Sequence, residues 1–191
     1  MTAPATSTLL VGLPGCGTTT RARELEAAQG ALRLSPDEWM IPLFGDSDAG
    51  GRRDALEGRL VTVGPAALVR GVDVVLDFGC LGRDERFAVH ALTADLGARY
   101  VMEYLPVDRS TQLARIADRW SRSPDRTFPM TAADVDRRRS IFQEPDPAES
   151  AGVAPPSAPH PWPDRWAWAV DRWPTLERPV TVPAPPMGPT R

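Results

Sequence analysis

The 191-residue sequence contains no lysine, so all 22 residues counted as lysine or arginine are arginines. It has only two cysteines, Cys16 and Cys80, which are too few for a disulfide scaffold or a structural zinc site, and we expect reduced thiols. It has no run of about 18 apolar residues, and residues 1–8 lack the pattern of a secretory signal. These absences argue against a membrane partner and predict a cytoplasmic location.

The chain is slightly acidic, with a formal net charge of −3 and no extended basic patch. A nucleic-acid partner is therefore disfavoured, although a local cluster of arginines could still bind a polyanion. A hydrophobic content of 42% is sufficient for one packed core in a chain of this length.

Short apolar segments alternate with helical patterns along most of the chain. Gly58, Gly64 and Pro65 are expected to weaken or split one long helix. The alternation predicts a three-layer α/β fold with a parallel sheet of about five strands, in which the strand ending at Val11 lies beside the strand ending at Leu76. Strands are predicted at residues 8–11, 31–34, 72–76 and 99–105, and helices at 18–28, 52–70, 83–96, 109–120 and 131–142.

The composition changes near Pro145, because 13 of the 21 prolines fall in the last 47 residues. We predict a domain over residues 1–149 and a proline- and tryptophan-rich extension over residues 150–191 that packs on or near it. Residues 165–171 could form a fifth strand, or residues 163–173 a short helix. Four tryptophans crowd this region, either as packing residues or as a surface for a ligand or partner: Trp162, Trp166, Trp168 and Trp173.

A glycine-rich segment lies between the first predicted strand and the first predicted helix. Its sequence, Gly12-Leu13-Pro14-Gly15-Cys16-Gly17-Thr18-Thr19, fits the pattern G-x-x-x-x-G-x-[ST] of a phosphate-binding loop. Backbone N–H groups of such a loop surround phosphate oxygens at the positive end of the helix dipole. The predicted nucleotide-binding residues are Gly12, Gly15, Cys16, Gly17, Thr18, Thr19 and Thr20, with the Thr19 hydroxyl also on Mg²⁺.

Thr18 occupies the position at which such loops usually carry lysine. A lysine there binds the β- and γ-phosphates and stabilises the transition state, and loss of one such donor typically costs about 10²–10³ in rate. Thr18 can donate only a neutral hydrogen bond. A general preference for arginine explains why lysine is absent elsewhere, but here the absence weakens the expectation of catalysis.

Two aspartates follow predicted strands. Asp77 is predicted to hold the magnesium ion, because a carboxylate at that strand end faces the phosphate-binding loop; the alternative is a polar cap on the strand end. Asp37 is predicted to be the general base that takes the proton of an attacking hydroxyl. The alternative for Asp37 is an acid at an ordinary helix N-terminus, where the helix dipole favours negative charge.

Arginines recur at helical spacing toward the end of the predicted helix at 109–120 and in the segment after it: Arg115, Arg119, Arg122 and Arg126. We predict that Arg122 and Arg126 close over the transferring phosphoryl group as part of a mobile lid. The alternative is a solvated helix face balanced by Asp118 and Asp125.

Four motifs carry a family resemblance: residues 12–17, Ser35-Pro36-Asp37-Glu38-Trp39, Val75-Leu76-Asp77-Phe78-Gly79 and Phe142-Gln143-Glu144-Pro145. Over residues 8–149 the chain resembles small bacterial P-loop kinases of the AAA-type ATPase family, the group with chloramphenicol phosphotransferase, the kinase half of polynucleotide kinases, and zeta toxins. The resemblance implies that the glycine loop and Thr19 hold ATP and Mg²⁺, that Asp37 is the base and that Asp77 is the Walker-B-like carboxylate. Arg83 and Arg86 match in kind, and Thr18 departs from the pattern.

Three functions are consistent with these residues. The first is an ATP-dependent phosphotransferase acting on a hydroxyl of a small molecule or a nucleic-acid end, with Arg122 or Arg126 compensating for the missing lysine. The second is a protein that binds a nucleotide or another phosphorylated ligand without transferring phosphate. The third is an enzyme that uses the same fold for ATP-independent chemistry.

Overall fold

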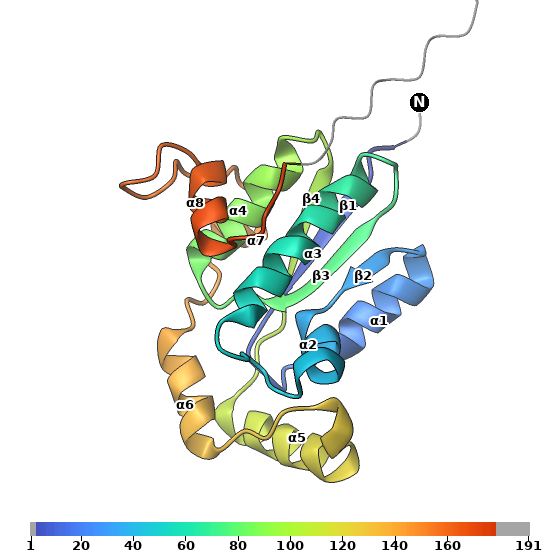
Figure 1. Cartoon of the computed structure of the whole chain (residues 1–191), viewed down its shortest axis with the longest axis vertical. Coiled ribbons are helices and arrows are strands. Elements are labelled where there is room, and N and C mark those ends of the chain that lie inside the picture. The colour runs from blue at the N-terminus through green and yellow to red at the C-terminus, as the bar shows by residue number, and fades with distance from the viewer. Residues whose placement is uncertain (1–2, 179–191) are drawn as a thin grey trace, which may run out of the picture.

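The computed structural model describes residues 3–178 and forms an α/β fold around one parallel sheet (Figure 1). The described residues contain four strands, compared with the expected five or so, in the order β2-β3-β1-β4. The predicted adjacency of the first and third strands is confirmed, with Leu9 opposite Leu76. The strands are β1 (Thr6–Val11), β2 (Leu32–Leu34), β3 (Val74–Gly79) and β4 (Arg99–Tyr104).

The helices cover both faces of the sheet, as the alternating pattern predicted. Figure 1 shows α5 and α6 lying beyond the carboxyl ends of the strands, where ligands bind in folds of this kind. The helices are α1 (Thr18–Gln29), α2 (Pro36–Phe44), α3 (Arg52–Leu68), α4 (Arg83–Ala94), α5 (Arg109–Arg122), α6 (Ala132–Ile141), α7 (Pro147–Ser150) and α8 (Arg165–Arg172), with a 3₁₀ turn at Pro124–Arg126. Among these described helices, none is both long enough and apolar enough to cross a membrane.

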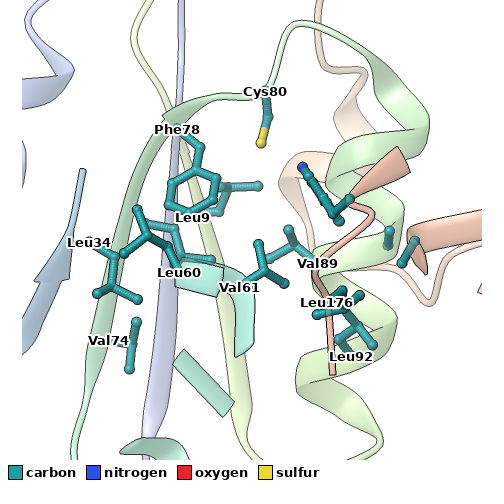
Figure 2. Packing of buried hydrophobic residues seen from close by; sticks show 14 of the residues in the cluster. Leu9, Leu34, Leu60, Val61, Val74, Phe78, Cys80, Val89, Leu92 and Leu176 are labelled. Carbon is teal, nitrogen blue, oxygen red and sulfur yellow. The ribbon is translucent and has the colours of Figure 1, made fainter. Parts of the chain in front are cut away.

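The hydrophobic core is divided by the sheet, because successive side chains of a strand point to opposite faces. Leu9 (Figure 2) and Leu76 belong to the larger cluster, with residues of α3, α4 and α8. Leu10 and Val75 pack with α1 on the other face. Both faces of the central strands are therefore buried, which explains their nearly continuous apolar sequences.

Helix α3 is continuous despite its two glycines and one proline. A Cβ atom at Gly58 would lie 2.5 Å from the Thr175 hydroxyl oxygen and 3.0 Å from the Leu176 backbone nitrogen. Gly64 faces the side chains of Leu34, Val74 and Leu76. The glycines and the proline therefore do not split the helix. Gly58 instead allows the C-terminal segment to pack directly on α3.

The C-terminal extension, as far as Arg178, packs into the core of the preceding domain. Residues 165–172 form a helix, so the alternative of a fifth strand is wrong. Trp173 is 1% exposed and lies in the larger hydrophobic cluster with Ala169 and Leu176. Nearby, the Arg86 guanidinium donates to the Glu149 carboxylate at 2.9 Å in a buried ion pair. Much of the proline- and tryptophan-rich segment is thus structural.

Candidate functional site

The glycine-rich segment turns tightly between β1 and α1. The Cys16 N–H donates to the Leu13 carbonyl oxygen at 3.0 Å, and Gly17 is the N-cap of α1 with a φ of 110°. The first turn of α1 contains no acidic residue, so nothing there competes with an anion for its N–H groups. This geometry is that of an anion-binding loop at a helix N-terminus.

The glycines of this loop are required for different reasons. At Gly12, a Cβ atom would lie 2.4 Å from the Cys16 sulfur and 2.9 Å from the Leu105 carbonyl oxygen. At Gly17, a Cβ atom would meet no atom of the described residues within 4 Å, but the positive φ disfavours any side chain. Gly12 therefore permits close packing beneath the loop, and Gly17 permits its left-handed turn.

Asp77 lies in β3, next to the start of α1. Its side chain is buried, the Ser35 hydroxyl is 3.4 Å from its Oδ2 atom, and the hydroxyls of Thr19 and Thr18 also face it. Burial raises the pKa of Asp77 above its usual range, while these hydroxyl groups favour the ionised form. The structure thus brings Asp77 and Thr19 together as the sequence predicted, and their role toward a metal stays a prediction.

Asp37 lies in the first turn of α2, and its side chain is 57% exposed. The Arg53 guanidinium donates to Asp37 Oδ1 at 2.7 Å and to Glu57 Oε1 at 2.8 Å. Asp37 is close enough to Asp77 for the two charges to interact. The predicted base therefore lies near the loop and is held in position by an arginine of α3.

The arginine that contacts the glycine-rich loop is Arg115 of α5, which was not one of the two predicted lid residues. Arg115 Nη1 donates to the carbonyl oxygens of Gly15 and Cys16, at 3.3 and 3.2 Å. Arg122 is 75% exposed and paired with Asp118, and Arg126 is 82% exposed. Of these three, Arg115 is the one in contact with the loop. The roles predicted for Arg122 and Arg126 stay predictions.

The remaining predicted loop residues contribute differently. Cys16 is buried beneath the loop with a free thiol whose pKa is raised by burial, and Thr20 is exposed on α1. Cys80 is also a buried free thiol, at the end of β3. Neither cysteine is in a disulfide within residues 3–178, and their redox state stays a prediction.

A cavity of about 570 Å³ lies at the carboxyl end of β3. Its walls come from α3, α4, α6 and α8, and they include Arg53, Arg138, Arg172 and Trp173. Because Arg53 also binds Asp37, the cavity adjoins the predicted base. Its lining arginines and Trp173 were not predicted as site residues; only the crowding of tryptophans in the extension hinted at them.

The fold and the loop together define a protein of the P-loop NTPase type. Residues 8–145 match the model of a family described as an AAA domain. The match covers most of the chain, and the chain belongs to this family. No curated protein sequence matches the chain at a significant level.

Solved structures of low sequence identity share the fold. A chain of the Pnkp1/Rnl/Hen1 RNA repair complex has 14% identity and a TM-score of 0.60, over 74% of this chain and 45% of that one, so this chain spans less than half its length. Kti12 from Chaetomium thermophilum, in complex with ADP-AlF3, has 18% identity and a TM-score of 0.55, over 74% and 82% of the two chains. A gluconokinase from Sinorhizobium meliloti 1021 has 15% identity and a TM-score of 0.53, over 92% and 93%.

Proposed function

We propose that this protein is an ATP-dependent phosphotransferase that moves the γ-phosphate of ATP to a hydroxyl of a small molecule. The observation that carries the proposal is the arrangement of an anion-binding loop, a buried acid and a cavity at one edge of the sheet. The loop spans Gly12 to Thr19, Asp77 faces Thr19, and Asp37 is joined to the cavity wall by its ion pair with Arg53.

In the proposed reaction, the acceptor hydroxyl oxygen attacks the γ-phosphorus of ATP. The bond between this phosphorus and the oxygen bridging to the β-phosphate breaks, and ADP leaves. Asp37 accepts the proton of the hydroxyl, using the oxygen that Arg53 does not bind. The ion pair with Arg53 joins this carboxylate to a residue that lines the cavity.

The groups around the loop fit a magnesium ion. Mg²⁺ prefers hard oxygen ligands, and it is usually held by one or two carboxylates together with phosphates and water. Thr19, Asp77 and Ser35 offer a hydroxyl, a carboxylate and a second hydroxyl in one place. The ion would neutralise negative charge on the β- and γ-phosphates.

Arg115 is our candidate for the cation that the missing lysine would have supplied. Its guanidinium already contacts the outer side of the loop through the Gly15 and Cys16 carbonyl oxygens. A rotation of this exposed side chain on α5 would bring a planar donor to phosphate oxygens, which arginine binds well. Arg122 and Arg126 remain candidates for a lid that closes over the phosphoryl group.

The first test is a calorimetric titration of the full chain with ATP, with and without Mg²⁺, followed by assays of phosphate release with hydroxylated acceptors. Binding and transfer support the proposal. Asp37→Asn should keep nucleotide binding and reduce transfer by about 10²–10⁴-fold, the usual contribution of a general base. Asp95→Asn, a change at an exposed residue that follows α4, is the matched control. An undiminished rate in Asp37→Asn would refute the role of Asp37.

Nucleotide binding without transfer is the second candidate. Thr18 favours it, because its hydroxyl faces Asp77 and supplies no positive charge to the phosphates. Binding of ATP without phosphate release under any acceptor condition would support this candidate against the first. If ATP does not bind at all, ATP-independent chemistry on this fold becomes the better explanation.

The phosphate acceptor is either a small molecule or the end of a nucleic acid. The fold likeness to a gluconokinase fits a small acceptor, and the likeness to a chain of an RNA repair complex keeps a nucleic-acid end as the alternative. We favour the small molecule because the cavity is of the size usual for small-ligand sites.

A further inference from the structure

The cavity beside Asp37 is built in part by the C-terminal extension. Trp168, Arg172 and Trp173 line it, and all three lie beyond the segment that matches the AAA domain family. Arg172 is held by Asp54 at 2.6 Å and Glu85 at 2.7 Å. This wall is therefore fixed by strong contacts to α3 and α4.

Most of the charges that line the cavity neutralise each other. Glu57 is buried, and it accepts from Arg53 at 2.8 Å, from Arg172 at 3.5 Å and from the Trp173 indole at 3.2 Å. Glu85 pairs with Arg172, and Asp84 pairs with Arg165 at 2.5 Å. Three of the four acids in the wall are thus already occupied by arginines.

The fourth acid, Asp48, accepts from the Gly51 N–H at 3.1 Å and pairs with no arginine of the described residues. Its carboxylate can accept further hydrogen bonds, because an ionised carboxylate has about four acceptor positions. A ligand with hydroxyl groups could satisfy these positions.

Arg138 is a cavity-lining arginine that forms no ion pair within residues 3–178. It projects from α6, it is half-buried, and it has no carboxylate within 4.0 Å among residues 3–178. Burial lowers its pKa, the nearby positive charges of Arg53 and Arg137 act in the same direction, and the negative charges of Asp37 and Asp134 oppose them. Arg138 is thus a half-buried cation with no carboxylate in ion-pair contact, and an anion in the cavity would supply that contact directly.

We propose that the cavity binds a small hydroxylated molecule that carries a carboxylate or phosphate group, and that Arg138 binds this anionic group. That the ligand is the phosphate acceptor rests on the proposed function, in which Asp37 takes the proton of the acceptor; the link between the two is Arg53, which lines the cavity and binds Asp37. The volume of about 570 Å³ fits a molecule of this size. Arg138 is then a specificity-determining residue, and the extension contributes a wall of the acceptor site.

The test is a calorimetric titration of the full chain, without nucleotide, against pairs of compounds that differ in charge. Glycerate and glycerol 3-phosphate are compared with glycerol, and gluconate is compared with glucose. We expect the best anionic compound to bind at least about tenfold more tightly than its neutral counterpart, since hydrogen bonds to charged groups are worth more than neutral ones. The preferred anion distinguishes a carboxylate from a phosphate ligand.

Three variants locate the effect. Arg138→Gln should lose the preference for the anion by about tenfold, and Arg138→Lys should retain part of it because the charge is kept. Arg137→Gln removes a neighbouring arginine of α6 that is 72% exposed and paired with Asp134, and it should leave the preference unchanged. Thermal unfolding of each variant identifies any that fails to fold. If one of the two Arg138 variants does not fold, the anion preference of the other one tests the proposal.

Several results would overturn the proposal: no binding by any of the anionic compounds, equal binding of charged and neutral partners, or an unchanged preference in Arg138→Gln. Tighter binding of a 5′-hydroxyl oligonucleotide than of every small acid would identify a nucleic-acid ligand instead. Binding of a small acid without any phosphate transfer would keep this site and refute only the proposed function. Phosphate transfer with no preference for an anionic acceptor would support the proposed function and refute the anion site at Arg138.

Discussion

The two sides of the candidate site are built in different ways. The phosphate side is shaped by backbone, with glycines that allow close packing and a left-handed turn over eight consecutive residues. The cavity side is shaped by side-chain charges from four helices, and Trp173 and Glu57, which form one of its contacts, are 116 residues apart. Local sequence thus determines the first side, and long-range packing determines the second.

The largest expected effect comes from the buried ion pair that joins α7 to α4. Glu149→Ala leaves Arg86, which is 1% exposed, without its carboxylate. We expect a loss of about 3–5 kcal/mol in the free energy of unfolding, the usual consequence of leaving one buried partner uncompensated. Urea unfolding measures it. Arg137→Ala, which breaks an exposed pair, should cost less than about 1 kcal/mol.

A double variant sharpens this result. Arg86→Met combined with Glu149→Leu replaces the buried pair by apolar side chains, and it should recover most of the lost stability. If Glu149→Ala alone changed stability by less than about 1 kcal/mol, the buried Arg86–Glu149 pair would not stabilise the fold in the way that we infer.

On the phosphate side, the corresponding change is Gly12→Ala. The added methyl group would meet the Cys16 sulfur and the Leu105 carbonyl oxygen, so we expect a loss of about 1–3 kcal/mol in unfolding free energy and weaker binding of ATP. Gly17→Ala meets open space, and it should cost a similar amount through backbone strain alone. Unfolding curves and ATP titrations of both variants separate steric from conformational effects. Wild-type behaviour of Gly12→Ala would contradict the close packing described here.

Adding a positive charge to the phosphate side should increase the affinity for ATP–Mg²⁺, and this effect is smaller than the losses above. Thr18→Lys is expected to tighten binding of ATP–Mg²⁺ by about tenfold, because a cation is restored beside phosphate oxygens in a partly desolvated site. If the proposed function holds, transfer also becomes faster. The measurement is calorimetric titration at matched salt, since charge contacts are screened. Ala27→Lys, at an exposed position in the last turn of α1, controls for net charge. No improvement in Thr18→Lys would mean that the loop is not a working nucleotide site.

The smallest expected effect concerns the pH dependence of stability. Burial raises the pKa of Asp77 in the folded state, so the folded protein holds a proton that the unfolded chain releases near the ordinary value of about 4. In the window between about 4 and the raised pKa, the Asp77 contribution to stability therefore falls as pH rises, by at most about 1.4 kcal/mol per pH unit. Asp77→Asn should lack this component. Urea unfolding across the window compares the two proteins, with Asp125→Asn as the exposed control; parallel curves would contradict the shift.

The difference between the two sides also explains what the sequence could predict. The strand, the loop and α1 follow from short-range patterns, and the position of Asp77 beside Thr19 follows from the adjacency of β1 and β3. The crowding of tryptophans allowed packing as one role for Trp173, but the sequence could not place this residue against Glu57, which lies 116 residues away. For the same reason, periodicity alone could not single out Arg115 from the other arginines of α5, or show that Arg138 lies in a cavity.

The tryptophans of the cavity give the site an optical signal of its own. Trp168 and Trp173 stand edge to face, with ring centroids 6.1 Å apart, and both line the cavity. Trp39 and Trp120, at 50% and 40% exposed, emit from a wet environment, whereas Trp173 is shielded from water. Fluorescence and near-ultraviolet circular dichroism should therefore respond to entry of a ligand beside this ring pair. Occupancy of the cavity can be followed without an attached dye.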